Sequence, residues 1–430
     1  MSETIPVREG EEIDRESLRA YLAERLDLAG REIEVEQFPA GSSNLTYLIR
    51  LGRASDLGAS SGSVPPVVAE GAFPTETADG SGTHLDASEH TQAGSPRSDV
   101  PGRADFVLRR PPHGNTVRSA HDMRREFDVL SKLSRVYRPA PKPLLFCDDE
   151  SVIGSEFYLM ERRHGIIIRG KIPGTQTTAA IRDRSAPPDV ADGNFRPDSG
   201  TQRDTQAGSL RPKEICRAFI ENLANLHRLD PQEAGLESLG RADDYNRRQV
   251  EGWTKRYAAA KTHEHADLEK AITWLNANIP PESSASLIHN DYKFDNVMHD
   301  PEDLAKITSV LDWEMVTIGD PLMDLGTSLG YWMSWDAPAE LLNMPFNPRI
   351  LMENITRQEL VEMYEKSLGR AVPDMLFYYV FGTFKIAVIA QQIYARYAKG
   401  FTKDERFARF DKFVGALGRI AAGAVASGSI

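Results

Sequence analysis

Two long polar segments constrain the fold of this chain more than any other feature of its sequence. Residues 54–104 and 174–212 consist mainly of Ser, Gly, Pro, Asp, Ala and Thr, and each segment contains a single aromatic residue, Phe73 and Phe195 respectively. Segments of this composition cannot bury enough apolar surface to offset the entropy lost on ordering. We therefore expect both to be disordered inserts, and the folded core to be built from the residues around them.

The residues around the first insert predict a small unit rich in β-structure. Alternating apolar and polar residues predict strands, and apolar residues at helical spacing predict helices. The predicted strands cover residues 33–38, 45–51, 105–110 and 156–161, and the predicted helices cover residues 14–29 and 120–133. A turn of small residues, 39–44, joins the first two strands into a hairpin whose tip lets the backbone approach a ligand closely.

The sequence after the second insert has a mostly helical pattern. Helices are predicted over residues 213–229, 241–260 and 264–278 and from residue 358 onward, with one short β-like segment over 287–316. Polar residues and a glycine interrupt the apolar stretch 376–394, so we expect a buried helix there rather than a membrane span. This order of elements predicts an α+β fold, with a small β-rich N-lobe over residues 1–160 and a larger helical C-lobe over residues 161–430.

Charge and cysteine content exclude several classes of protein. The net charge of −12, from 51 Lys and Arg against 63 Asp and Glu, leaves no basic surplus for a phosphate backbone, so we expect no nucleic-acid partner. Cys147 and Cys216 are too few for a disulfide framework, and the apolar surroundings of Cys216 favour a buried thiol. Residues 1–12 are acidic and lack an apolar core, so we expect no signal peptide, no membrane association and a cytoplasmic location.

The densest chemical signal lies in residues 287–298, with the sequence Leu-Ile-His-Asn-Asp-Tyr-Lys-Phe-Asp-Asn-Val-Met. Asp312 follows, in an apolar stretch that we predict to be a strand over residues 310–316. A lone buried carboxylate is very costly, and a divalent metal shared with Asn296 would supply its partner through oxygen ligands. Asp291 would then be free to accept a proton from a hydroxyl nucleophile, with Lys293 beside it as a charge for a phosphoryl group.

The pattern of His289, Asp291, Lys293 and Asn296 followed by Asp312 resembles the catalytic and metal-binding loops of the protein-kinase-like superfamily. Further segments make the chain similar to the aminoglycoside phosphotransferase family, and within it to the kinase domains related to acyl-CoA dehydrogenase family members ten and eleven. These segments are residues 41–47, 107–112, 119–126, 311–324 and 384–391. The resemblance covers most of the chain outside the two inserts.

The resemblance implies a protein-kinase-like two-lobe fold and a role for each residue of the motif. It implies that Asp291 is the catalytic base, that Lys293 contacts the transferred phosphate, and that His289 is a structural residue of the loop. It also implies that Asn296 and Asp312 bind Mg²⁺.

The resemblance further implies an ATP site in the N-lobe. It assigns a phosphate-covering loop to Gly41, Ser42, Ser43 and Asn44. It assigns a hinge beside adenine to Met160 and Arg162. Glu126 is expected to pair with the basic residue of the third strand. Most kinase-like proteins have a Lys at that position, whereas this chain has Arg109 and Arg110. Arg109 shares a strand face with Val107, which favours Arg109, and an arginine can bind the α- and β-phosphates bidentately.

Several other polar and aromatic residues have structural explanations. Asp320 and Asp324 lie beside Gly319 and Pro321, which favours capping and loop hydrogen bonds over metal ligation. His227 is expected to be a packed helix residue. The aromatic group of Tyr331, Trp332 and Trp335 fits the core and a substrate-binding wall equally well.

The sequence thus predicts an ATP- and Mg²⁺-dependent phosphotransferase that acts on a hydroxyl of a small molecule. The resemblance points to a hydroxy acid or hydroxyacyl-CoA as acceptor and to a separate acyl-CoA dehydrogenase as a partner. Phosphorylation of an aminoglycoside is an alternative within the class. A nucleotide-binding pseudoenzyme and a metal-dependent hydrolase are alternatives from other classes. The hydrolase would use His289, Asp291, Asp295 and His299 as its metal cluster.

Overall fold

The computed structural model describes residues 4–26, 28, 32–39, 44–52, 105–112, 122–169, 212–332, 341 and 355–430. Both predicted inserts lie outside these residues, apart from Pro212. Gly41, Ser42 and Ser43 of the expected phosphate-covering loop lie outside them as well.

A five-stranded antiparallel sheet forms the N-lobe, with the strand order β1-β2-β3-β5-β4. Its strands are β1 (Ile33–Gln37), β2 (Leu45–Leu51), β3 (Asp105–Arg110), β4 (Pro143–Cys147) and β5 (Phe157–Glu161). Four of the five were predicted from the sequence. Strand β4 was not, because it begins with a proline and continues as an unbroken apolar run without a period of two.

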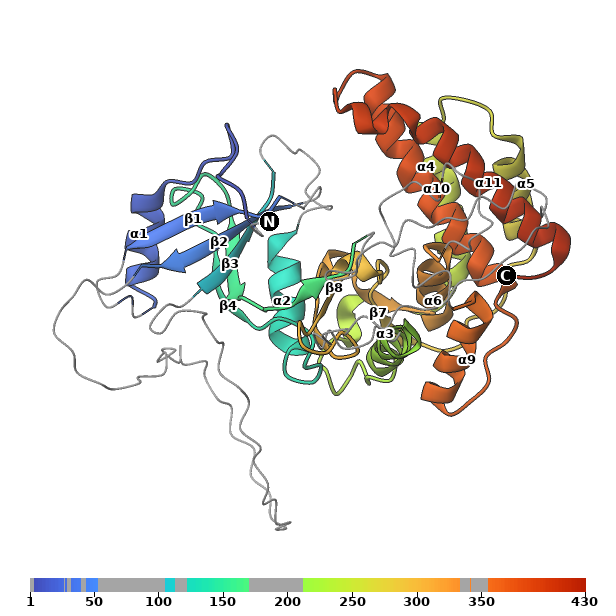
Figure 1. Ribbon diagram of the computed structural model, residues 1–430, viewed down its shortest axis with the longest axis horizontal. Helices are drawn as coiled ribbons and strands as arrows, with labels where there is room; N and C mark the ends of the chain where they lie inside the picture. Colours follow the sequence, from blue (N-terminus) through green and yellow to red (C-terminus); the bar gives the residue numbers. More distant parts are fainter. Residues whose placement is uncertain are drawn as a thin grey trace, which may run out of the picture.

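A helix covers each face of the sheet. Helix α1 (Arg15–Ala23) contributes Leu18 and Leu22 to a cluster with the inward-facing residues of β1, β2 and β3. It is shorter than the predicted 14–29, and Leu28 is buried beyond its end. Helix α2 (Met123–Leu133) packs against β4 and β5, and it lies between the sheet and the rest of the molecule (Figure 1).

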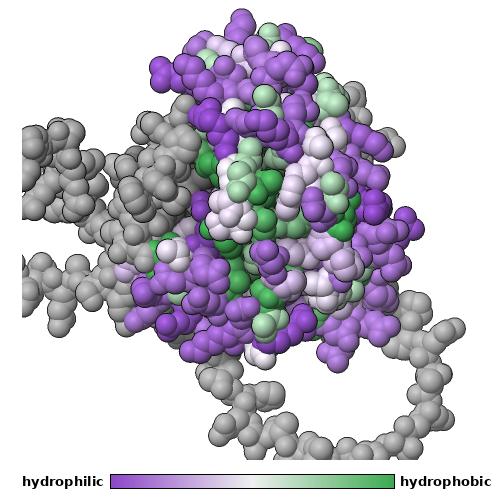
Figure 2. All heavy atoms as spheres, turned by 90° about the vertical axis from the view of Figure 1, so that its right-hand side faces the viewer, coloured by the Kyte–Doolittle hydropathy of each residue, from purple (hydrophilic) through white to green (hydrophobic). Residues whose placement is uncertain are grey.

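The C-lobe is a helical bundle built around one long helix. Helix α10 (Leu376–Ala398) packs against α4 (Tyr245–Ala260), α5 (Ala266–Ala277), α6 (Pro321–Gly330) and α11 (Phe410–Ser427). Other helices among the described residues include α3 (Pro212–His227), α9 (Arg357–Leu368), η2 (Glu237–Leu239) and η5 (Glu405–Arg409). Helix α10 is long and apolar enough to cross a membrane, yet most of it is buried inside the bundle, as the sequence predicted. A strip of hydrophobic residues remains visible along the middle of the lobe face in Figure 2, with polar residues around it.

Short strands between the helices carry the loops of the predicted motif. Strands β6 (Ile166–Ile167), β8 (Val297–His299) and β9 (Ile307–Val310) form one small sheet, and β7 (Ser286–Ile288) pairs with β10 (Thr317–Gly319). The prediction of a strand over residues 310–316 is wrong. Strand β9 ends at Val310, and Asp312 has a φ of 68° and begins the short helix η4 (Trp313–Met315). The indole of Trp313 donates to the Val310 carbonyl at 2.8 Å, which closes this turn.

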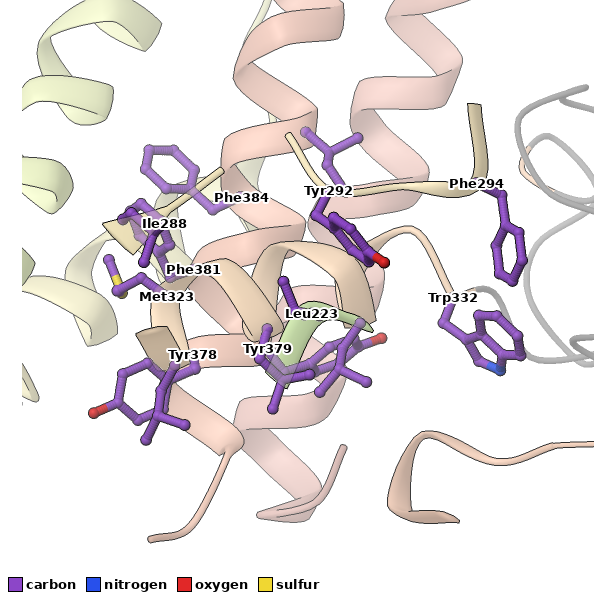
Figure 3. Packing of buried hydrophobic residues seen from close by; sticks show 14 of the residues in the cluster. Leu223, Ile288, Tyr292, Phe294, Met323, Trp332, Tyr378, Tyr379, Phe381 and Phe384 are labelled. Carbon is purple, nitrogen blue, oxygen red and sulfur yellow. The ribbon is translucent and has the colours of Figure 1, made fainter. Parts of the chain in front are cut away.

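Buried aromatic residues anchor the motif in the C-lobe core. Ile288, Tyr292 and Phe294 are buried in one cluster with Phe381 and Phe384 of α10, as Figure 3 shows from close by. These three residues of the segment 288–294 are therefore fixed by packing, and Asn290, Asp291 and Lys293 between them remain partly exposed.

Helices α6 and α10 approach so closely that only glycine fits at the contact. A Cβ atom added to Gly326 would overlap the Tyr378 carbonyl, and one added to Gly382 would overlap the Gly326 carbonyl.

We expect Gly326→Ala to lower the free energy of unfolding by about 1–3 kcal/mol, the usual effect of overpacking, as measured by urea denaturation. Gly423→Ala in α11 is the control, because its Cβ would meet no atom within 4 Å. This variant should be about 0.5–1 kcal/mol more stable than the parent. Equal effects of the two substitutions would contradict the close contact.

Candidate active site

The loop that follows β7 is held in place through its backbone by a buried carboxylate. Asp324 of α6 is fully buried, and its oxygens accept hydrogen bonds from the amides of His289 at 2.7 Å and Asn290 at 2.8 Å. His227 of α3 contacts the same carboxylate at 3.2 Å and contacts the Tyr364 hydroxyl at 2.7 Å. Burial alone would raise the pKa of Asp324, but the hydrogen bond and charge of His227 and the contribution of His289 lower it below its ordinary value.

These contacts refine what the sequence predicted for the two residues. Asp324 makes loop hydrogen bonds, as expected, whereas His227 is a hydrogen-bonding partner of Asp324 and not merely a packed residue. The neighbouring Asp320 caps α6 by accepting a hydrogen bond from the Leu322 amide at 3.0 Å, which was also expected.

His289 connects the loop to the segment that carries Asp312. Its Nε2 contacts the Leu311 carbonyl at 2.9 Å, and its Nδ1 accepts a hydrogen bond from the Asp291 amide at 3.3 Å. Both ring nitrogens are therefore engaged by backbone groups, which agrees with the structural role predicted for this residue.

The carboxylate of Asp291 lies at the centre of the site. Its Oδ2 accepts hydrogen bonds from Lys293 Nζ at 2.7 Å and from Asn296 Nδ2 at 3.0 Å. Its Oδ1 accepts a longer hydrogen bond from the Tyr331 hydroxyl at 3.4 Å, and 16% of the side chain remains exposed. Burial would lower the pKa of Lys293, but nearby Tyr331 and Asp291 outweigh it and raise the pKa, so the ammonium stays charged.

Asn296 and Asp312 come together because strands β8 and β9 pair. Val297 lies opposite Val310, and directly beyond this pair the Leu311 amide donates to the Asn296 carbonyl at 2.8 Å. Asp312 was expected in a buried strand, but 30% of its side chain is exposed, because the turn at the end of β9 carries it out of the core. Its Oδ1 lies 3.2 Å from a guanidinium nitrogen of Arg109.

The two arginines of β3 point to opposite faces of the sheet. Arg109 forms a buried ion pair with Glu126 of α2 at 2.6 Å, which confirms the predicted pairing. Burial opposes a charge at this position, but Glu126, Tyr158 and Asp312 together raise the pKa of Arg109. Arg110 instead donates to the Tyr47 hydroxyl and to the carbonyls of Ile153 and Glu11.

Contacts between the lobes bring the N-lobe to the Asp312 segment. The side-chain amide of Asn44, at the end of the β1–β2 hairpin, donates to Glu314 at 2.9 Å. Arg125 of α2 donates to the carbonyls of Glu314 and Val316. Neither Arg125 nor Glu314 was predicted as a site residue, although Arg125 lies within one of the segments that carry the family resemblance.

The predicted hinge lies where the chain leaves the sheet. Met160 is buried in β5, and β5 ends one residue later. Arg162 follows on the connection to β6 and forms an ion pair with Asp105 at 2.5 Å.

The metal cluster of the hydrolase alternative does not form, so this alternative is wrong. His299 contacts the Leu304 carbonyl at 2.7 Å and stacks on Phe294, while Asp295 lies 3.7 Å from Arg169. Among the described residues, no group of three or more His, Cys, Asp or Glu side chains is arranged to hold a metal ion.

Comparison with known proteins decides the family. A model of the phosphotransferase enzyme family matches residues 97–185 and 195–345, which together make up more than half of the chain. The chain belongs to this family. It is also 33% identical over 318 residues to acyl-CoA dehydrogenase family member 11 of Gallus gallus, a match that covers 73% of this chain and 37% of that protein. The match to family member 10 of Mus musculus is 32% over 299 residues, or 69% of this chain and 25% of that protein.

The chain spans about a third or less of the length of these curated relatives. Its fold is similar to that of a solved Ralstonia eutropha protein assigned to the aminoglycoside phosphotransferases. The TM-score is 0.64 at 24% identity, over 96% of this chain and 99% of that chain. This similarity confirms the protein-kinase-like α+β fold. The family is one of phosphotransferase enzymes.

The buried Asp324 carboxylate generates a prediction about stability and pH. At neutral pH, Asp324→Asn should lower the free energy of unfolding by about 1.5–3 kcal/mol, because the backbone amides of His289 and Asn290 lose a charged acceptor. The folded pKa of Asp324 lies below its unfolded value, so its stabilisation is present above about pH 4 and is lost as the pH falls through the folded pKa. The difference between variant and parent should therefore shrink on acidification.

Urea denaturation at neutral pH and at about pH 3 measures this difference. Asp267→Asn on α5 is the control, because Asp267 is 40% exposed and its ion pair in the described part of the chain is with Lys270; it should change stability by less than about 0.5 kcal/mol. A difference for Asp324→Asn that is independent of pH would contradict the charged state of the carboxylate.

Proposed function

We propose that the chain transfers the γ-phosphoryl group of ATP to the hydroxyl of a small hydroxy acid or hydroxyacyl-CoA. The setting of Asp291 carries this proposal. One of its oxygens is held by Lys293 and Asn296, while the other makes a single longer hydrogen bond and the side chain remains accessible. A carboxylate oriented in this way can receive the proton of an acceptor hydroxyl.

The N-lobe supplies the residues that we assign to ATP. Arg109 is fixed by Glu126 and extends toward Asp312, so its guanidinium is oriented before a ligand arrives. A planar guanidinium suits phosphate oxygens, and its pairing with Glu126 corresponds to the lysine–glutamate pair of protein kinases. Asn44 belongs to the proposed phosphate-covering loop together with Gly41, Ser42 and Ser43, and Met160 and Arg162 belong to the proposed adenine hinge.

Asn296 and Asp312 fit the requirements of Mg²⁺. This ion prefers oxygen ligands and is commonly held by one or two protein carboxylates together with phosphate oxygens and water. The side-chain amide nitrogen of Asn296 donates to Asp291. This leaves the side-chain oxygen Oδ1 of Asn296 for a metal beside the partly exposed carboxylate of Asp312. When bound there, Mg²⁺ would neutralise charge on the phosphates.

The residues of the chain contribute to the reaction by positioning the donor and the acceptor and by stabilising charge. Phosphoryl transfer needs little covalent help from the protein, because alignment of donor and acceptor and stabilisation of charge supply most of the rate. In our proposal Asp291 orients the acceptor hydroxyl and takes its proton at Oδ1. Lys293, whose raised pKa keeps it protonated, offsets negative charge on the transferred group. His289 and Asp324 hold the loop that carries both residues.

The acceptor class rests on the relatives. Both curated relatives named above are acyl-CoA dehydrogenase family members, and the matched region is a minor part of each. For a kinase region that accompanies acyl-CoA chemistry, the most suitable acceptor is a hydroxy acid or its CoA ester. An acyl-CoA dehydrogenase is accordingly the proposed functional partner.

Asp291→Asn tests the proposed mechanism. We expect turnover, followed as ADP formation with a mixture of hydroxy acids, to fall by about 10²–10⁴-fold, because the variant cannot accept the proton. ATP binding, measured by calorimetry, should be retained. The matched control is Asp295→Asn in the same loop, which faces Arg169 and should change turnover by no more than a few-fold. Near-normal turnover of Asp291→Asn would remove Asp291 from the mechanism.

A further inference from the structure

Lys385 is a buried cation in the middle of helix α10, close to the catalytic loop. Only 3% of the residue is exposed. Its ammonium donates a hydrogen bond to the Asn290 carbonyl at 2.5 Å and lies 5.6 Å from the centre of the Trp253 ring on α4. The proposed mechanism does not use this residue.

Lys385 has no ion-pair partner among the residues that the structure describes. Its ammonium has three donors, of which one is used by Asn290, and no carboxylate of the described residues forms an ion pair with it. Burial lowers the pKa of Lys385 to about 8, although Asp291 and Asp324 oppose the shift. A methionine could fill the same space without the cost of burying a charge. The ammonium is therefore better explained by a ligand than by packing.

The position of Lys385 relative to Asp291 indicates which ligand this is. Asn290 immediately precedes Asp291, so the ammonium lies one peptide group from the proposed base. Arg109 approaches the site from the sheet, whereas α10 belongs to the helices at the other end of the molecule (Figure 1). In-line transfer places the nucleotide and the acceptor on opposite sides of the moving phosphoryl group. The atoms of the acceptor beyond its hydroxyl then extend toward α4 and α10.

A second cation strengthens the positive charge on this side. The guanidinium of Arg256 lies 4.6 Å from the centre of the same Trp253 ring. Trp253 thus contacts two cations from two helices, within a chain whose net charge is −12. Such a local field attracts an anion and repels a cationic acceptor such as an aminoglycoside.

We propose that Lys385 binds the carboxylate of the acceptor and thereby selects hydroxy acids over neutral and cationic alcohols. One N–H of its ammonium remains on the Asn290 carbonyl, so the same group sets the position of the acceptor relative to Asp291. This inference rests on the proposed function and narrows its acceptor class to the free acid.

Binding of matched acids and amides tests the proposal without relying on turnover. The probes are a series of straight-chain hydroxy fatty acids and their primary amides, titrated by calorimetry into protein saturated with Mg²⁺ and a non-hydrolysable ATP analogue. The parent should bind at least one acid about tenfold or more tightly than its amide, the usual effect of a charged hydrogen bond. Lys385→Met should abolish this preference. Lys399→Met, at the exposed end of the same helix, should keep it.

Lys385→Gln separates charge from hydrogen bonding, because its amide can still donate to the Asn290 carbonyl. It should also lose the preference for the acid, and it serves as the test if the methionine variant does not fold. A parent that binds no acid more tightly than its amide overturns the proposal, as does a folded charge-free variant that keeps the preference. Lys385-dependent binding of an acid without phosphate transfer would instead refute the proposed function alone.

Discussion

The hydrogen bonds between the Asp324 carboxylate and the amides of His289 and Asn290 are the constraint on which the site depends. They fix a loop in which Asn290 adopts a φ of 68°, a conformation that non-glycine residues rarely adopt, and this bend turns Asp291 out of the core. The buried carboxylate is tolerated because His227 and the two amides surround it, and His227 is held in turn by Tyr364. Helices α3, α6 and α9 therefore converge on one charge, and the position of the proposed base follows from their packing.

The same loop also positions the residues that contact the N-lobe. His289 contacts the Leu311 carbonyl, which positions the turn that carries Asp312, and Asp312 meets Arg109 of the sheet. Arg125 and Asn44 contact the residues of the next short helix, η4. Polar contacts thus join the two lobes around Asp312, beside a hydrophobic cluster that continues from α2 and β5 of the N-lobe into the C-lobe.

The local sequence pattern predicted most elements of the fold. The features that it did not predict depend on contacts between residues far apart in the sequence. The local pattern predicted β1, β2, β3 and β5, and the alternation of side chains along a strand predicted that Arg109 rather than Arg110 faces Glu126. The strand assigned to Asp312 was wrong because an apolar run does not distinguish a strand from a turn closed by Trp313. The partners of Asp324 and Lys385 could not be predicted, because His227 and Asp324 are 97 residues apart and Lys385 and Asn290 are 95 residues apart. No local pattern records such pairs.

In our proposal this site moves a phosphoryl group from ATP to the hydroxyl of a hydroxy acid or of its CoA ester. Phosphorus NMR of the parent protein with Mg²⁺, ATP and a mixture of hydroxy acids, hydroxyacyl-CoAs and aminoglycosides observes the product directly. We expect a new phosphate monoester resonance that grows in step with ADP and arises from a hydroxy acid or its CoA ester. Release of inorganic phosphate alone, or a phosphate ester formed only on an aminoglycoside, would contradict the proposal.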